Sequence, residues 1–274
     1  MVRILLKITK DYWKGRFEMN LLKKMKNRLH LFLEFRKFSI SRVKTIRLLT
    51  ESSSNLIKSY QIEVEKDYIF LKSLREKFKE NFIYAPSRTD FFYSSVGGSI
   101  FFPFVTLYIL TRLLKPNLVV ETGGTPGKSS SFILRAMERN GAGKLFTIDL
   151  PPDEVVPKKS KGIDKSHEVL PEGENAGWLI PEWLKGRHTL LKGPSKVHLP
   201  TLLEKLETID IFIHDSDHSY ENMMWEFKAA WPHLKNQGLL IADDIGTHTA
   251  FPDFCESVKG VRFFIANYGI IRKK

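Results

Sequence analysis

The sequence predicts an α/β fold: a doubly wound, mostly parallel sheet of seven strands that ends in an antiparallel hairpin and follows a helical N-terminal extension. Three observations carry this prediction. Short apolar runs recur along residues 118–271, helical patterns lie between most of them, and several runs end in a carboxylate. Apolar strands that alternate with helices form a parallel sheet with helices on both faces. With 274 residues, the chain has room for one domain and an extension.

The N-terminal extension is basic. Residues 1–50 contain 14 Lys and Arg against three acids, so they carry +11 of the net charge of +12. Apolar residues recur there at helical spacing: Leu22, Met25, Leu29 and Phe32. Such a helix packs on the domain or on a second copy of the chain, as most amphipathic helices do, or it lies on an acidic membrane surface. We favour packing and keep a homodimer and a membrane contact through residues 1–50 as alternatives.

A second helical segment follows the basic one. A polar cluster at residues 50–54 predicts a break, after which a helical pattern runs from about Leu56 to Phe82. We therefore divide the chain into a helical extension, residues 1–90, and a second unit, residues 91–274. The second unit is nearly neutral, with 22 basic against 21 acidic side chains. It lacks the positive surface that nucleic-acid binding needs, so we expect no nucleic acid as a partner.

The second unit begins with a helix expected over Phe101–Leu114. Strands are then expected at Leu118–Glu121, Lys144–Asp149, Thr189–Leu191, Ile209–Asp215, Leu239–Asp243, Val261–Ile265 and Tyr268–Ile271. Further helices are expected at Ser129–Arg139, Leu199–Leu206 and Tyr220–Leu234. The last two strands leave no room for a crossover helix, so they form the antiparallel hairpin. Residues 151–187 hold five prolines and four glycines with little periodicity, which predicts a cap or lid.

Composition excludes several classes of protein. A hydrophobic fraction of 42% and a charged fraction of 27% are ordinary for a soluble globular chain. The longest apolar run, Ile100–Leu110, is too short for the roughly 20 residues that span a bilayer, and the first residues contain no apolar signal-peptide stretch. Cys255 is the single cysteine, which excludes an internal disulfide and a thiolate zinc site. We therefore expect a cytoplasmic location.

A glycine-rich loop, Glu121–Ser130, joins the first strand to the next helix. In such sheets ligands bind beyond the carboxyl ends of the strands, and glycines let the backbone turn sharply and a ligand approach it. Gly127-Lys128-Ser129 looks like the end of a nucleotide-binding P-loop. However, the loop is one residue too short, and Glu121 would repel a triphosphate. An NTPase with an irregular loop stays an alternative.

The order Glu121-x-Gly123-x-x-x-Gly127 resembles motif I of the class I S-adenosylmethionine-dependent methyltransferases, which have a Rossmann-like fold. The acid suits a cofactor that carries a sulfonium and an ammonium group rather than phosphates. The next strand ends in Asp149, and adjacent strand tips lie about 5 Å apart, so its carboxylate can accept both ribose hydroxyls. The resemblance covers about residues 95–274. It implies cofactor contacts from Glu121, Thr122, Gly123, Gly124, Gly127, Ser129, Asp149, Leu150, Gly193, Ser195 and Asp215.

Asp215 and His218 follow the fourth strand, and Asp243-Asp244 follow the fifth. Three carboxylates at neighbouring strand ends suit a hard cation such as Mg²⁺, which takes oxygen ligands. The pattern resembles the cation-dependent catechol-type O-methyltransferases, which implies Asp215, Asp243 and Asp244 as metal ligands. Those enzymes usually have Asn where this chain has Asp244. His218 lies where they have a basic residue, and an ordinary pKa near 6.5 suits a general base.

These residues also have ordinary structural explanations. Asp215 or Asp217 could cap the next helix, Asp243-Asp244 could form a turn, and His214 is expected to be a core histidine. Weighing both, we predict an S-adenosylmethionine-dependent methyltransferase that acts on the oxygen of a small molecule or sugar, with Asp215 and His218 in catalytic roles and Mg²⁺ as an optional aid. The alternatives are the NTPase and a non-catalytic membrane-surface module whose basic helices carry the function.

Overall fold

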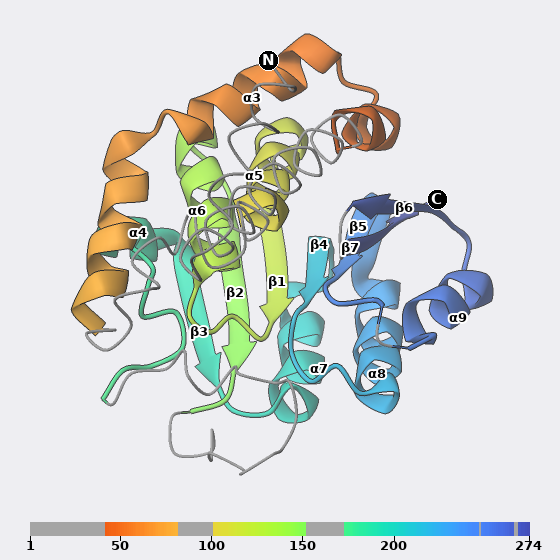
Figure 1. Cartoon of the computed structure of the whole chain (residues 1–274). Helices are drawn as coiled ribbons and strands as arrows, with labels where there is room; N and C mark the ends of the chain where they lie inside the picture. Colours follow the sequence, from red (N-terminus) through yellow and green to blue (C-terminus); the bar gives the residue numbers. More distant parts are fainter. Residues whose placement is uncertain (1–41, 82–100, 152–172, 247, 266–267) are drawn as a thin grey trace, which may run out of the picture.

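A seven-stranded sheet with helices on both faces organises the chain (Figure 1). This computed structural model describes residues 42–81, 101–151, 173–246, 248–265 and 268–274. The strand order is β3-β2-β1-β4-β5-β7-β6. Strand β7 is antiparallel to both of its neighbours, and the other neighbouring strands are parallel. The predicted mostly parallel sheet with an antiparallel hairpin is therefore confirmed.

The strands are β1 Leu118–Thr122, β2 Lys144–Asp149, β3 His188–Lys192, β4 Ile209–His214, β5 Leu234–Ala242, β6 Gly260–Ile265 and β7 Tyr268–Lys273. The helices are α3 Ser54–Glu65, α4 Tyr68–Asn81, α5 Phe101–Leu114, α6 Lys128–Asn140, α7 Ser195–Leu206, α8 Tyr220–Ala230 and α9 Ala250–Ser257. Two 3-10 helices, η3 Glu182–Arg187 and η4 Trp231–His233, precede β3 and β5. A further helical stretch covers residues 42–50.

The core lies on both faces of the sheet. Val119 belongs to an apolar cluster with α5 and α6, whereas Val120 belongs to a second cluster with α7, α8 and α9. Both valines are fully buried. A parallel strand that is covered on both faces favours apolar residues on both, which is why the first part of β1, Leu118–Val120, is recognisable in the sequence as an apolar run.

Ion pairs anchor the helical extension to the sheet's covering helices. Glu63 of α3 accepts hydrogen bonds from Arg112 Nε of α5, at 2.8 Å, and from the Tyr108 hydroxyl. Asp67, between α3 and α4, accepts a hydrogen bond from Arg135 Nε of α6 at 2.7 Å. The Asp67 side chain is only 4% exposed. The extension is therefore fixed to α5 and α6, although the boundary expected near residue 90 lies outside the described residues.

The helical pattern expected from Leu56 to Phe82 is two helices, which is a correction to the sequence prediction. The chain leaves the helix at Lys66 and Asp67. Asp67 Oδ1 accepts the backbone N–H of Phe70 at 3.2 Å, as the N-cap of α4 does. Apolar spacing continues through this cap, so periodicity alone could not locate the break.

Two further differences lie in the C-terminal half. Helix α8 ends at Ala230 rather than at Leu234, because Pro232 cannot donate a helical hydrogen bond, and β5 begins as early as Leu234. Helix α9 was not expected. No helix in the ranges described above is both long and apolar enough to cross a bilayer. The amphipathic pattern predicted for residues 22–32 lies outside the described residues.

Candidate active site

The carboxyl ends of β1, β2, β4 and β5 meet at one edge of the sheet, because these strands are parallel. The glycine loop follows β1, Asp149 ends β2, Asp215 follows β4, and Asp243 follows β5. The strand order reverses its direction between β1 and β4, and ligands of such sheets bind at that switch point. The residues predicted to bind cofactor and to catalyse thus share one edge.

Gly123 holds the glycine loop against the segment after β4. Its φ is +71°, and a Cβ at this position would lie 2.0 Å from the carbonyl oxygen of Asp215. The Asp215 N–H donates to the Thr122 carbonyl at 2.8 Å. Only glycine allows this approach, so the loop expected to hold cofactor and the loop expected to hold catalytic groups are built as one unit.

Asp149 closes the glycine loop. Its Oδ2 accepts hydrogen bonds from the N–H groups of Gly124 and Thr125, both at 2.8 Å, and from the Thr125 hydroxyl at 2.7 Å. Its Oδ1 accepts the Leu150 N–H at 2.8 Å and has capacity for another donor. Sequence reasoning assigned Asp149 to the ribose and missed this loop-capping role. A phosphate cradle would need the same N–H groups, so the geometry does not suit the P-loop alternative.

Glu121 is a buried carboxylate beneath the loop, with 0% exposure. Its Oε2 accepts hydrogen bonds from the hydroxyls of Ser130 and Thr147, whereas its Oε1 has no hydrogen-bond partner among the described residues. Burial raises the pKa of Glu121, and hydrogen bonds from Ser129, Ser130 and Thr147 oppose that rise. His188 Nε2 lies 3.0 Å from Thr147 Oγ1 and extends the network toward β3.

Asp215 and His218 lie together at the end of β4. His218 Nε2 is 3.9 Å from Asp215 Oδ1, and their side chains are 27% and 32% exposed. Restricted solvation raises the pKa of Asp215 well above its ordinary value despite this exposure, and the negative charge of Asp243 adds to the rise. Burial, with repulsion from Asp244, raises the pKa of Asp243 to about 6. The edge of the sheet is therefore crowded with negative charge.

Lys128 and Ser129 open α6 directly after the glycine loop. Burial lowers the pKa of Lys128 to about 7, while the attraction of Asp215 opposes that shift. Ser129 is 4% exposed. The sequence analysis considered Lys128 only as part of a P-loop and did not predict its electrostatic attraction to Asp215.

A buried network under this edge centres on Glu226 of α8, which sequence reasoning did not single out. Its Oε2 lies 2.7 Å from His214 Nδ1 and accepts the Thr122 hydroxyl, and its Oε1 accepts the Ser216 hydroxyl at 2.8 Å. His214 was expected to be a satisfied core histidine. It is fully buried, but only Nδ1 has a hydrogen-bond partner in the described part of the chain. The sequence did contain a signal for Glu226, because it is an acid at a position of helix α8 that the apolar pattern predicts to be buried.

The remaining predicted cofactor residues reach the same edge. The Gly193 N–H donates to the Asp149 carbonyl at 2.8 Å. Ser195 begins α7 and donates a hydrogen bond to Glu226. Leu150 is 37% exposed next to Asp149. These positions are compatible with the adenosine side of the expected cofactor.

Helix capping does not use the carboxylate of Asp215. The hydroxyl of Ser219 caps α8 by accepting the Asn222 N–H at 3.3 Å. Asp217 supports that cap, because its Oδ1 accepts the Ser219 N–H at 3.0 Å. Tyr220 donates its hydroxyl to Asp253 Oδ2 at 3.1 Å and so joins α8 to α9.

The geometry does not support the expected Mg²⁺ site at Asp215, Asp243 and Asp244. Among the residues whose positions are described, no group of three or more His, Cys, Asp or Glu side chains could hold a metal ion. Asp243 is half-buried and Asp244 is exposed. The side chains of Asp215 and Asp243 do interact, but the strand ends alone could not show whether a third ligand completes a metal site.

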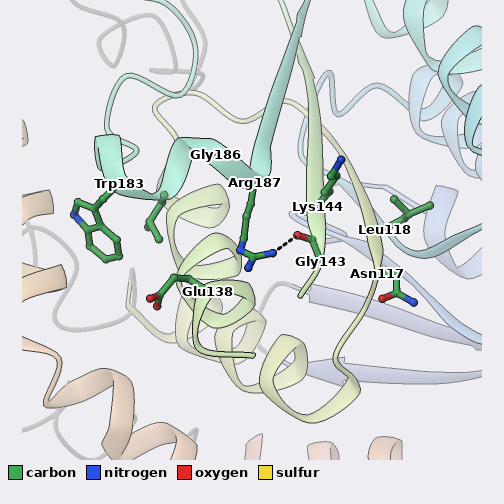
Figure 2. Close-up of a pocket in the computed structure, with 9 residues that line it drawn as sticks. Asn117, Leu118, Glu138, Gly143, Lys144, Trp183, Gly186 and Arg187 are labelled. Atoms are coloured by element: carbon green, nitrogen blue, oxygen red, sulfur yellow. Dashed lines mark hydrogen bonds between the residues drawn. The ribbon is translucent and has the colours of Figure 1, made fainter. Parts of the chain in front are cut away.

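Of the expected lid, residues 152–172 lie outside the described residues. Trp178, within the segment expected to form the lid, is buried in the core, with 5% exposure. Trp183 lines a cavity of about 670 Å³ at the amino ends of β1 and β2, together with Asn117, Lys144 and Arg187 (Figure 2). Arg187 Nη1 donates to the Gly143 carbonyl there at 3.2 Å. This cavity lies at the opposite end of the strands from the glycine loop, so it is separate from the candidate site.

Comparison with known proteins agrees with this geometry. Residues 120–245 match the family described as a methyltransferase domain. Similar solved structures include a Podospora anserina methyltransferase with SAH bound, at 15% identity, with 74% of this chain and 88% of that chain covered and a TM-score of 0.49. Another is the O-methyltransferase from Bacillus cereus in complex with SAH, at 14% identity, with 74% and 91% covered and a TM-score of 0.47. No curated protein matches the chain. The family match, on a sheet of this order, shows a methyltransferase domain over residues 120–245.

Proposed function

We propose that the chain methylates a hydroxyl oxygen of a small molecule, such as a sugar, and that His218 is the general base. The observation that carries this proposal is the pairing of His218 with Asp215, 3.9 Å apart, on a loop that Gly123 holds against the cofactor-binding loop. Both side chains are partly exposed, and the His218 Nε2 atom next to Asp215 is itself buried.

The residues at this edge fit S-adenosylmethionine. The carboxylates of Glu121 and Asp215 suit its sulfonium and ammonium groups, and Glu121 Oε1 is a buried acceptor that lacks a partner among the described residues. Asp149 Oδ1 has capacity to accept a ribose hydroxyl. The N-terminus of α6, with Ser129, suits its carboxylate, because helix N-termini favour anions. When bound, the cofactor supplies an electrophilic methyl group.

The chain's own residues then have two tasks. The substrate hydroxyl must lose its proton as the new C–O bond forms and the C–S bond breaks, and His218 accepts that proton. The neighbouring Asp215 carboxylate stabilises the imidazolium that results. We assign no step to Mg²⁺, because the described carboxylates do not form a site for it. The acidic edge favours a neutral hydroxyl over a polyanionic acceptor.

The first experiment is calorimetry of S-adenosylmethionine binding to the full chain and to Asp149→Ala, with and without Mg²⁺. We expect binding by the wild type that Asp149→Ala weakens, because the glycine loop loses its cap, and no dependence on Mg²⁺. Unchanged binding by Asp149→Ala would contradict the cofactor site.

The second experiment separates catalysis from binding. His218→Gln should lower kcat about 10²- to 10⁴-fold in a methyl-transfer assay with hydroxyl compounds, while cofactor affinity stays the same. His233→Gln, which changes a half-buried histidine of η4 that contacts the Glu207 carbonyl, is the control and should keep the wild-type kcat. Methylation confined to amine acceptors would overturn the oxygen assignment.

Vesicle co-sedimentation tests whether the N-terminal extension binds a membrane, and sedimentation velocity tests whether it forms a homodimer.

A further inference from the structure

Helix α4 of the N-terminal extension binds a segment of the chain, residues 173–181, which we call the strap and of which residues 176–181 are buried. Lys77 Nζ donates hydrogen bonds to the backbone carbonyls of Trp178, at 3.2 Å, and Ile180, at 2.8 Å. Trp178, Leu179 and Ile180 are 5%, 0% and 1% exposed. A charged donor that binds two carbonyls of a buried segment fixes the position of that segment strongly.

The strap in turn lies against the end of the glycine loop. The Leu179 N–H donates to the Pro126 carbonyl at 3.0 Å. Gly127 has a φ of +102°, and a Cβ there would lie 2.9 Å from the Cα of Gly177 and 3.0 Å from the Ile180 side chain. The two backbones are therefore in direct contact, and neither can move without the other.

The start of helix α4 is itself held against helix α6. Asp67 caps α4 and is bound by Arg135 of α6, while α6 itself begins at Lys128, directly after the glycine loop. Lys77 lies ten residues beyond this anchor, nearly three turns along α4. Helix α4 therefore connects the body of α6 to the strap, and the strap connects back to the loop at the start of α6.

We propose that Lys77 is a positioning residue for the cofactor: through the strap it fixes Pro126 and Gly127, so the helical extension is needed for S-adenosylmethionine affinity. The proposal rests on the proposed role of the glycine loop in holding the cofactor. It gives the extension a function in the reaction, in addition to packing. It also means that this part of the expected lid acts on the cofactor rather than on the substrate.

Three variants of the full chain test the proposal. Lys77→Met removes the two hydrogen bonds, Lys77→Arg keeps a charged donor, and Lys72→Met changes an exposed lysine of the same helix. For Lys77→Met we expect Kd for S-adenosylhomocysteine and KM for S-adenosylmethionine to rise about tenfold, with kcat within about twofold, because the Pro126–Gly127 end of the loop is displaced while Gly123 keeps its contact with the Asp215 segment. Lys77→Arg should restore most of the affinity, and Lys72→Met should match the wild type.

A merely structural role for Lys77 predicts a different result. Lys77→Met would then lower Tm but leave Kd unchanged well below the melting temperature, and that outcome overturns the proposal. If Lys77→Met does not fold, hydrogen exchange of the wild type replaces it. Slower exchange of the Leu179 amide on S-adenosylhomocysteine binding supports the proposal, and unchanged exchange overturns it. Ser129→Ala tests the proposed function separately. If this variant binds S-adenosylhomocysteine as tightly as the wild type, the glycine loop does not hold the cofactor.

Discussion

Replacing Glu226 by alanine should destabilise the protein by about 3–5 kcal/mol, the usual effect of removing one member of a buried polar pair. The Glu226 side chain has 0% exposure. It bonds to groups from two segments that meet under the candidate active site: Thr122 at the end of β1, and His214 and Ser216 at and just after the end of β4. Loss of this carboxylate therefore loosens the base of the site as well as the core.

The magnitude follows from the groups that the variant leaves behind. Alanine removes both acceptor oxygens, so His214 Nδ1 and the Thr122 hydroxyl lose a partner where neither side chain is exposed to water, at about 1–3 kcal/mol for each unsatisfied group. Glutamine keeps the volume and one acceptor oxygen, and should cost about 1–2 kcal/mol. One kcal/mol lowers Tm by roughly 2–4 °C in a protein of this size, so Glu226→Ala should lower Tm by roughly 6–20 °C.

Urea unfolding at pH 7, followed by tryptophan fluorescence, measures the free energy of unfolding, and scanning calorimetry measures Tm. Glu221→Ala is the matched control, since Glu221 is an exposed acid in the first turn of the same helix. It should cost less than about 1 kcal/mol. A loss of under about 1 kcal/mol for Glu226→Ala, or equal losses for the two variants, would refute the reasoning.

Three other predictions follow. Gly123→Ala should weaken S-adenosylhomocysteine binding at least about 100-fold by calorimetry, because its Cβ would meet the Asp215 carbonyl at 2.0 Å; wild-type affinity would contradict this. Arg135 holds the pKa of Asp67 below its ordinary value, although burial acts in the opposite direction. Asp67→Asn should therefore cost about 2–3 kcal/mol in urea unfolding at pH 7, and the difference should shrink as the pH falls below about 3.9 and through the lower native pKa; a pH-independent difference would argue against the pair. Phe212→Ala, at 0% exposure in β4, should cost about 3–5 kcal/mol by the same method, and a cost near zero would mean that the core repacks.

The regular elements were predictable where burial alone decides the residue type. The expected bounds of α5, Phe101–Leu114, and of β2, Lys144–Asp149, are those of the structure, because apolar residues fill most of the buried positions in both elements. The break at Asp67 was not predictable in this way. A cap depends on one polar side chain, and the apolar pattern on either side is the same with or without it.

The candidate site was predictable to the level of strand ends, but not of atoms. The parallel order places Asp149, Asp215 and Asp243 at one edge whatever their partners are. Which donors a carboxylate takes depends on distances of a few ångströms between segments far apart in the sequence. Asp149 therefore turned out to bind the Gly124 and Thr125 amides, and Glu226 of α8 turned out to be the centre of a buried network.

Strand β7 is made after β6 yet lies between β5 and β6 in the sheet. A chain emerges from the ribosome with its N-terminal part first, at ~5–20 residues per second, so one edge of β5 stays unpaired for roughly 2–6 s while residues 243–273 are made. An unpaired strand edge is a template for pairing with other chains. Nascent chains are thus most prone to aggregate in this interval, and slow translation of α9 and β6 would prolong the risk.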